Sequence, residues 1–154
     1  MNLKFAIENN KVTRQNMLTL LSNLSYEEAF MIPEGFSNSI GWNFIHCLVT
    51  QQLLTYHLSG SKMLLDQEVV DQFRKGASGK ETLSESSFQR LCDIALPILD
   101  LVHEDLEKLE SNDFQTYTTS YNITLNSTKE AIYFNNTHEG VHFGIMLQIK
   151  KWIK

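Results

Sequence analysis

The chain has 154 residues, of which 42% are hydrophobic and 20% are charged, and this composition fits one globular domain with its own apolar core. Its formal net charge of −5 disfavours broad binding to nucleic-acid phosphates, which needs clustered lysines and arginines. No apolar stretch reaches the length of a membrane span or a secretory signal, so we expect a cytoplasmic protein without membrane partners.

The first half of the chain predicts two long helices. Only two prolines and seven glycines occur in the whole sequence, mostly between periodic stretches, which favours long helices. The first helix is predicted from about Leu3 to Leu21, and residues 25–39 are predicted to be a connection. The second helix is expected to begin at the small polar residues 37–39, which can cap free amide groups, and to end near Gly60.

The third helix follows a long loop. Residues 60–80 are predicted to be this loop, with one short helical piece. Thr82 and Glu85 form a candidate capping box, and apolar residues then recur at three- and four-residue steps as far as Leu109. Pro97 lies inside this run, so we expect a kink there rather than two separate helices.

The fourth helix is predicted near the C-terminus. Residues 111–126 are polar and lack a helical period, which predicts a crossing loop or a short extended segment. Ser127 and Glu130 then repeat the capping pattern, and the helix is expected to run to about Ile153.

Four helices, with long connections after the second and the third, predict an all-α four-helix bundle. We expect one such domain over residues 1–154. The alternative is an irregular α-domain with a small β-ribbon over residues 117–125.

The two cysteines, Cys47 and Cys92, lie far apart and form no C-x-x-C pattern. Each falls inside an apolar helical stretch. We therefore interpret them as small buried hydrophobic residues in a reducing compartment.

Two histidines share one face of the fourth helix. His138 and His142 are four residues apart, so their side chains lie about 6 Å apart along the axis, on a stripe of core positions. Buried imidazoles need hydrogen-bond partners, and a charged pair would repel. A divalent cation bound by both neutral rings resolves both problems. The alternative is a pair of core histidines that hydrogen-bond within the protein.

A third histidine would strengthen the metal hypothesis, and His46 is the best candidate. It lies on an apolar face of the second helix, four residues after Trp42. His57 is about 16 Å further along the same helix, too far for one ion to reach both rings. His103 adjoins the polar face of the third helix and is expected to be solvated.

Glu139 lies between the two histidines in "HEGVH", which formally matches the H-E-x-x-H pattern of metalloproteases. In that pattern the glutamate acts as the general base. A solvated surface charge is the interpretation that we prefer for this residue.

The segments "NSIGWNFIHCL" and "HEGVHFGIM" together resemble the DinB superfamily, which includes YfiT-like and bacillithiol-transferase-like proteins. The family pattern is Trp-x-x-x-His on the second helix and His-x-x-x-His on the last. The likeness implies a four-helix bundle with a divalent-metal site, for zinc or nickel, formed by His46, His138 and His142. It also implies similarity to metal-dependent transferases of low-molecular-weight thiols or to thiol-dependent isomerases.

Three neutral imidazoles leave at least one coordination position open, as in catalytic metal sites. The resulting hypothesis is metal-assisted transfer of a small thiol to an electrophile, in a pocket between the second and fourth helices. The alternatives are a metal-dependent small-molecule hydrolase with Glu139 as base, a non-enzymatic metal- or ligand-binding bundle, and a purely structural histidine cluster. A homodimer is also expected, with Trp152 as a candidate contact. Candidates to orient the rings are Asn43, Thr50, Asn135 and Glu139.

Overall fold

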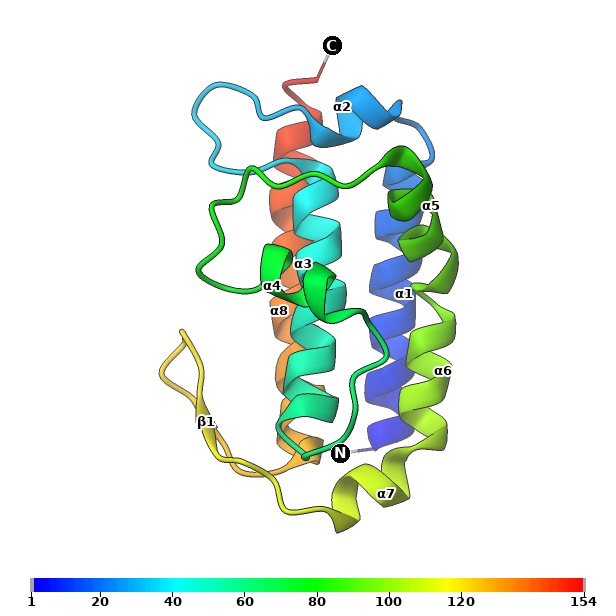
Figure 1. The fold of residues 1–154 in the computed structure, drawn as a ribbon, viewed down its shortest axis with the longest axis vertical. Helices are drawn as coiled ribbons and strands as arrows, with labels where there is room; N and C mark the ends of the chain where they lie inside the picture. The colour runs from blue at the N-terminus through cyan, green and yellow to red at the C-terminus, as the bar shows by residue number, and fades with distance from the viewer. Residues whose placement is uncertain (1, 154) are drawn as a thin grey trace.

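Three long helices run side by side through the computed structural model, which describes residues 2–153 (Figure 1). They are α1 (Leu3–Leu21), α3 (Ile40–Gln52) and α8 (Thr128–Lys150). The last of these packs against both of the others. A fourth column is formed by α5 (Glu85–Ile94) followed by α6 (Pro97–Glu104), and α6 packs against α1. The predicted all-α four-helix bundle is thus confirmed.

Side-chain caps begin two of the long helices where the sequence predicts them. Ser39 Oγ accepts the backbone N–H of Trp42 at 3.0 Å, and Ser127 Oγ accepts that of Glu130 at 3.2 Å. These contacts satisfy amide groups that have no partner within the helix. The first helix has the predicted bounds, whereas α8 ends at Lys150, slightly before the expected end.

The end of α3 continues directly into one wider turn, the π-helix η1 (Leu53–His57). In this turn the N–H of Leu58 donates to the carbonyl of Leu53 at 3.1 Å, five residues back instead of four. Such turns are rare and occur frequently at functional sites. The chain leaves the helix at Gly60, whose φ of +66° suits glycine far better than other residues.

The fourth column, which the sequence predicts as the third helix, differs from the prediction at Pro97. We expected one kinked helix, but α5 ends at Ile94 and a separate helix, α6, begins at Pro97, followed by α7 (Leu106–Ser111). Proline lacks the N–H that would continue the hydrogen-bond ladder, and it is well tolerated at a first helical position. The carbonyl of Ala95 in this break accepts a hydrogen bond from Arg14 at 2.8 Å.

The start of the fourth column is also shifted from the predicted capping box. The N-cap is Ser84, whose Oγ accepts the N–H of Ser87 at 3.2 Å, so the Thr82–Glu85 box does not form. A capping box instead lies in the segment predicted as a connection. There Ser25 and Glu28 begin the short helix α2 (Tyr26–Phe30).

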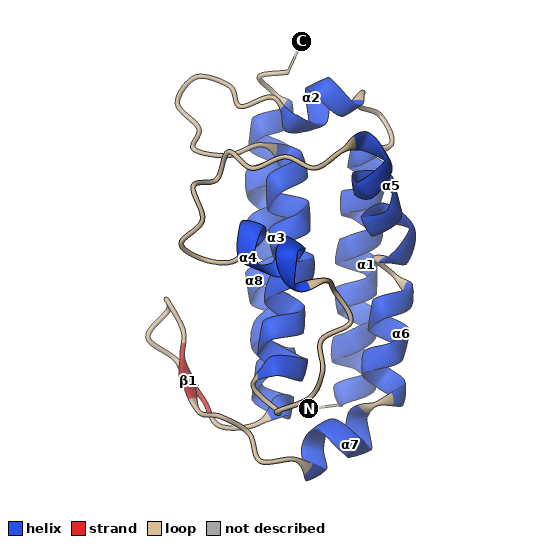
Figure 2. Ribbon diagram, in the orientation of Figure 1, coloured by secondary structure: helices blue, strands red, loops and turns tan. Residues whose placement is uncertain are grey.

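The two long connections contain the remaining elements. The predicted helical piece of the middle loop is α4 (Gln67–Phe73), which packs across α3. The polar segment before α8 forms an antiparallel pair of very short strands, β1 (Tyr117–Thr118) and β2 (Thr124–Leu125) (Figure 2). The ribbon of the alternative fold therefore exists, but it lies beside a bundle rather than replacing it.

The largest apolar cluster lies where α1, α3, α5 and α8 meet, and α3 contributes most to it because nearly all of its residues are buried. The buried residues of α3 include the polar side chains of Asn43, Gln51 and Gln52. Among residues 2–153, no helix has the length and apolar content needed to cross a membrane.

Candidate metal centre

Three imidazoles meet between α3 and α8. His46 comes from α3, and His138 and His142 come from successive turns of α8. Their potential ligand nitrogens all lie within 4.8 Å of one another. The ring centres are 5.2 Å apart for His46 and His138, 4.8 Å for His46 and His142, and 4.5 Å for the pair on α8. The structure thus brings together the three histidines selected from the sequence.

The ring of His46 is held from two sides. The indole of Trp42, one turn earlier, stacks on it with ring centres 4.8 Å apart and planes 12° apart. Its Nδ1 lies 2.6 Å from the backbone carbonyl of Phe73 at the end of α4. Because a carbonyl only accepts hydrogen bonds, Nδ1 carries the hydrogen and Nε2 keeps a free lone pair. The closest polar neighbour of that Nε2 is the hydroxyl of Thr50, at 3.4 Å.

The ring of His142 is held by Asn43. Its Nδ1 lies 2.8 Å from Oδ1 of Asn43, whose amide nitrogen donates to Asn38 Oδ1 and to the Ser39 carbonyl. These two bonds fix which end of the amide faces the imidazole. Nδ1 of His142 is therefore the donor, and its Nε2 is free to bind an ion.

His138 is the histidine with an unsatisfied atom. Its Nδ1 is buried and has no hydrogen-bond partner among the described residues. A buried polar atom without a partner costs free energy, which a bound cation would remove. This orphaned nitrogen, beside two rings that each have a free Nε2, fits the donor set of a divalent metal such as zinc or nickel.

All three rings favour the neutral form that binds metal. Burial, together with the neighbouring His142 and His46, lowers the pKa of His138 to about 2. Burial and His46 lower the pKa of His142 to about 4. Burial also lowers the pKa of His46, although its hydrogen bond to the Phe73 carbonyl acts in the opposite direction. Metal binding at neutral pH would therefore displace few protons.

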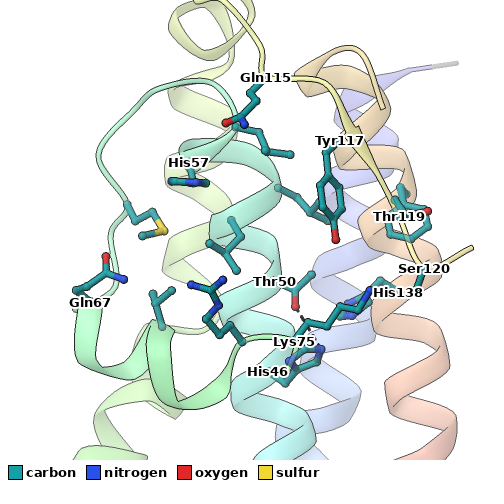
Figure 3. A pocket seen from close by; sticks show the side chains of 17 residues that line it. His46, Thr50, His57, Gln67, Lys75, Gln115, Tyr117, Thr119, Ser120 and His138 are labelled. Atoms are coloured by element: carbon teal, nitrogen blue, oxygen red, sulfur yellow. Dashed lines mark hydrogen bonds between the residues drawn. The ribbon is translucent and has the colours of Figure 1, made fainter. Parts of the chain in front are cut away.

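A cavity of about 530 Å³ opens directly beside His46 and His138 (Figure 3). Its walls come from α3, η1, α4 with the two residues that follow it, α8 and the β1–β2 ribbon. The volume lies in the range of small-molecule sites. Figure 3 shows the ring of Tyr117 and the side chain of Thr50 inside this space, near the histidine end.

The chain was compared with models of known protein families. Residues 10–146 match the model of the DinB superfamily, which covers most of the chain and all three histidines. The chain belongs to the DinB superfamily. No curated protein matches it. Membership of this superfamily and the three-histidine cluster together fit a metal-dependent protein.

The expectation that Glu139 is a solvated surface charge is wrong. Its side chain is fully buried and forms an ion pair with the equally buried Arg14 of α1. Asn135, one turn earlier, donates to the same carboxylate at 3.0 Å. Glu139 is not among the residues that line the cavity, so the carboxylate lies away from any ligand held there.

Of the four residues considered for orienting the rings, only two contact the histidines. Asn43 and Thr50 do so, whereas Asn135 and Glu139 lie on the α1 side of α8 and hydrogen-bond there. His57 is exposed and lines the far part of the cavity, and His103 is exposed outside it.

A support that the sequence reasoning missed is Glu81, in the loop after α4. Its Oε2 accepts the indole N–H of Trp42 at 2.9 Å, and its two oxygens accept the backbone N–H groups of Ser78 and Gly79. Burial opposes ionisation, but these hydrogen bonds outweigh it and lower the pKa of Glu81 to about 2. The charged carboxylate thus ties the loop to the indole that stacks on His46.

Proposed function

We propose that this protein is a metal-dependent enzyme that transfers a low-molecular-weight thiol to a small electrophile. His46, His138 and His142 are the proposed ligands of one zinc or nickel ion. The observation that carries the proposal is the convergence of three neutral imidazoles, two of which line a cavity large enough for a small molecule. When bound, the ion would supply Lewis-acid stabilisation of a thiolate at neutral pH.

The chain's own cysteines support an external thiol. Burial raises the pKa of Cys47 well above its ordinary value, and burial raises that of Cys92 to about 11. Both are free thiols, and neither is among the residues that line the cavity. A nucleophilic sulfur at the histidines must therefore come from a bound small molecule.

The protein's own groups prepare the site for that thiol. Phe73 and Asn43 accept the Nδ1 hydrogens of His46 and His142, so both rings present Nε2 towards the shared point. The apolar residues of η1, together with Phe134 of α8, give the cavity an apolar wall. In the proposed reaction a sulfur–carbon bond forms, the leaving group departs from the electrophile, and the thiol proton passes to solvent.

A thiol-transfer assay tests the proposal. Glutathione, bacillithiol, mycothiol and coenzyme A would each be offered with 1-chloro-2,4-dinitrobenzene, whose chloride is displaced by a thiolate. We expect turnover with at least one thiol for metal-loaded protein, and its loss both after chelation and in His138→Ala. His103→Ala, which changes an exposed histidine outside the cavity, is the matched control and should keep the activity.

Three outcomes would contradict the proposal. Equal rates for loaded and chelated protein would exclude the metal. Metal-dependent ester or amide hydrolysis without added thiol, and no thiol transfer, would favour the hydrolase alternative. Stoichiometric metal without turnover in either assay would favour a non-enzymatic metal-binding bundle.

The cytoplasmic location and the homodimer stay predictions.

A further inference from the structure

The cavity wall is cationic in an acidic protein. The chain has 18 acidic and 13 basic residues, yet the cavity is lined by Arg74 and Lys75 and by no aspartate or glutamate among the described residues. The other polar lining groups are amides and hydroxyls, from α3, α4 and the segment that forms the β1–β2 ribbon, and the imidazoles of His46, His57 and His138.

Both basic side chains are available to a ligand. The nearest acid to Arg74 is Asp71, with 3.7 Å between Nη1 and Oδ1 and with both side chains 57% exposed, so this pair is loose. Among residues 2–153, Lys75 makes no salt bridge. The charges on this wall are therefore not neutralised by the fold itself.

The backbone fixes these two cations close to the histidine cluster. The carbonyl of Phe73, the residue just before Arg74, accepts the Nδ1 hydrogen of His46 at 2.6 Å. The chain cannot move away from the histidines at this point without breaking that bond. Figure 3 shows Lys75 at the same end of the cavity as His46 and His138.

We propose that the cavity binds a small anionic molecule whose carboxylate or phosphate group is held by Arg74 and Lys75. This inference extends the proposed function. Only one part of it, the assignment of a thiol to the other end of the ligand, rests on that function. Three neutral imidazoles would not neutralise the charge of a bound divalent ion. Arg74 and Lys75 add two further positive charges to the lining of the same cavity. A neutral or cationic ligand would leave all of this positive charge without a partner, whereas an anion pairs with it.

The geometry also orients the ligand. Its anionic group contacts the residues that follow α4, its sulfur reaches the histidines, and its remaining part lies along Leu53, Leu54 and Phe134. Arginine and lysine recognise carboxylate and phosphate by the same charge-assisted hydrogen bonds. The test therefore needs one arm for each group.

The binding test uses ligands that cannot form a thiolate and protein stripped of metal. N-acetyl-S-methylglutathione is compared with its diethyl ester, which is neutral, and S-methyl-phosphopantetheine with S-methyl-pantetheine, by calorimetry. We expect at least one anion to bind about tenfold more tightly than its neutral counterpart, the size expected from two exposed charge pairs. This preference should shrink when the ionic strength rises from about 0.05 to about 0.5 M.

Matched variants locate the effect. Arg74→Gln/Lys75→Gln should lose the preference for the anion and keep its affinity for the neutral compound, which also shows that the cavity is intact. Arg90→Gln/Lys151→Gln removes the same two charges from exposed positions outside the cavity and should behave as wild type.

The inference is overturned if neither anion binds more tightly than its neutral partner, or if the preference survives in Arg74→Gln/Lys75→Gln. Failure of the proposed function has a different signature. Anion preference that depends on Arg74 and Lys75, in a protein without any thiol-transfer activity, would support the anion site and contradict the thiol chemistry.

Discussion

Helix α8 carries two polar clusters on its two sides, and they differ in whether the protein itself satisfies them. Towards α1, Glu139 pairs with Arg14 inside the bundle, and both are fully buried. Towards α3, His138 and His142 meet His46, and the only hydrogen bond from residues 2–153 to a ring nitrogen that faces the cluster is that of the Thr50 hydroxyl, 3.4 Å from Nε2 of His46. The first cluster is closed by its own charges, whereas the second leaves Nδ1 of His138 without a hydrogen-bond partner among the described residues.

The comparison shows why neighbouring positions in one motif take different roles. His138 and Glu139 are adjacent in sequence, but one helical step of about 100° turns them to different partner helices. In this chain the match to H-E-x-x-H therefore does not place the glutamate beside the histidine cluster. The following predictions test this division, from the largest expected effect to the smallest.

Glu139→Gln should have the largest effect. It would leave the guanidinium of Arg14 buried without its counter-charge, which costs roughly 3–5 kcal/mol of the free energy of unfolding. Urea denaturation measures this loss. Glu8→Gln, an exposed change on α1, is the control and should stay within about 0.5 kcal/mol of wild type.

A second variant keeps this test informative if Glu139→Gln does not fold. Arg14→Met/Glu139→Leu removes both charges and should recover most of the stability, because the uncompensated charge is gone. If Glu139→Gln lowers the free energy of unfolding by less than about 1 kcal/mol, this would contradict the interpretation that Arg14 and Glu139 neutralise each other inside the bundle.

Only the histidine cluster should respond to metal. A zinc or nickel concentration of about 100 times the dissociation constant should raise the free energy of unfolding of wild type by about 2.7 kcal/mol. His138→Ala should show no such increase, whereas His103→Ala should match wild type. An equal increase in His138→Ala would mean that the ion binds elsewhere.

Asn43→Ala should weaken metal affinity about 10- to 100-fold, because it removes the acceptor that orients His142. Competition with a chromophoric chelator measures the affinity. Asn136→Ala is the matched control, since this asparagine hydrogen-bonds to α1 on the other side of α8. Unchanged affinity in Asn43→Ala would show that the ring needs no such support.

The metal-free protein should lose stability as the pH falls below about 6.5. The folded state holds the pKa of His138 at about 2 and that of His142 at about 4, mainly through burial, whereas the unfolded chain protonates its histidines near 6.5. Protons therefore bind the unfolded chain preferentially in this window, at a cost of roughly 1 kcal/mol per histidine at pH 5.5.

Urea midpoints at pH 7.5 and 5.5 measure this dependence. Between these two pH values, we expect the free energy of unfolding of His142→Ala to change less than that of wild type. This difference would assign part of the pH dependence to the histidine cluster. The lowered pKa of Glu81 acts in a lower range, between about 4.5 and 2, so it does not overlap. Identical slopes for wild type and His142→Ala would contradict the assignment.

Local patterns in the sequence suffice for the bundle and for the three histidines. Helical periodicity and the caps at Ser39 and Ser127 determine α3 and α8, and four-residue spacing places His138 and His142 on one face. The apolar face of the second helix made His46 the best third candidate, and the resemblance to a family implied the same residue. These features depend on neighbours along the chain, so a single sequence contains them.

The supports of the site depend on contacts between distant segments, which local patterns do not encode. The Phe73 carbonyl, at the end of the short helix α4, and the Glu81 carboxylate, in the loop that follows, contact α3 from the connection between two long helices. One signal for Glu139 was present, however. Arg14 lies on the buried stripe of α1 with Asn10 and Met17, and a cation there requires a buried counter-charge.

The most direct test of the account is the metal content of untagged protein after loading with zinc or nickel and removal of free ion. We predict one ion per chain in wild type and in His103→Ala, and almost none in His46→Ala, His138→Ala or His142→Ala. Wild-type protein without a stoichiometric ion, or His46→Ala that retains it, would contradict the claim that these three imidazoles form one metal site.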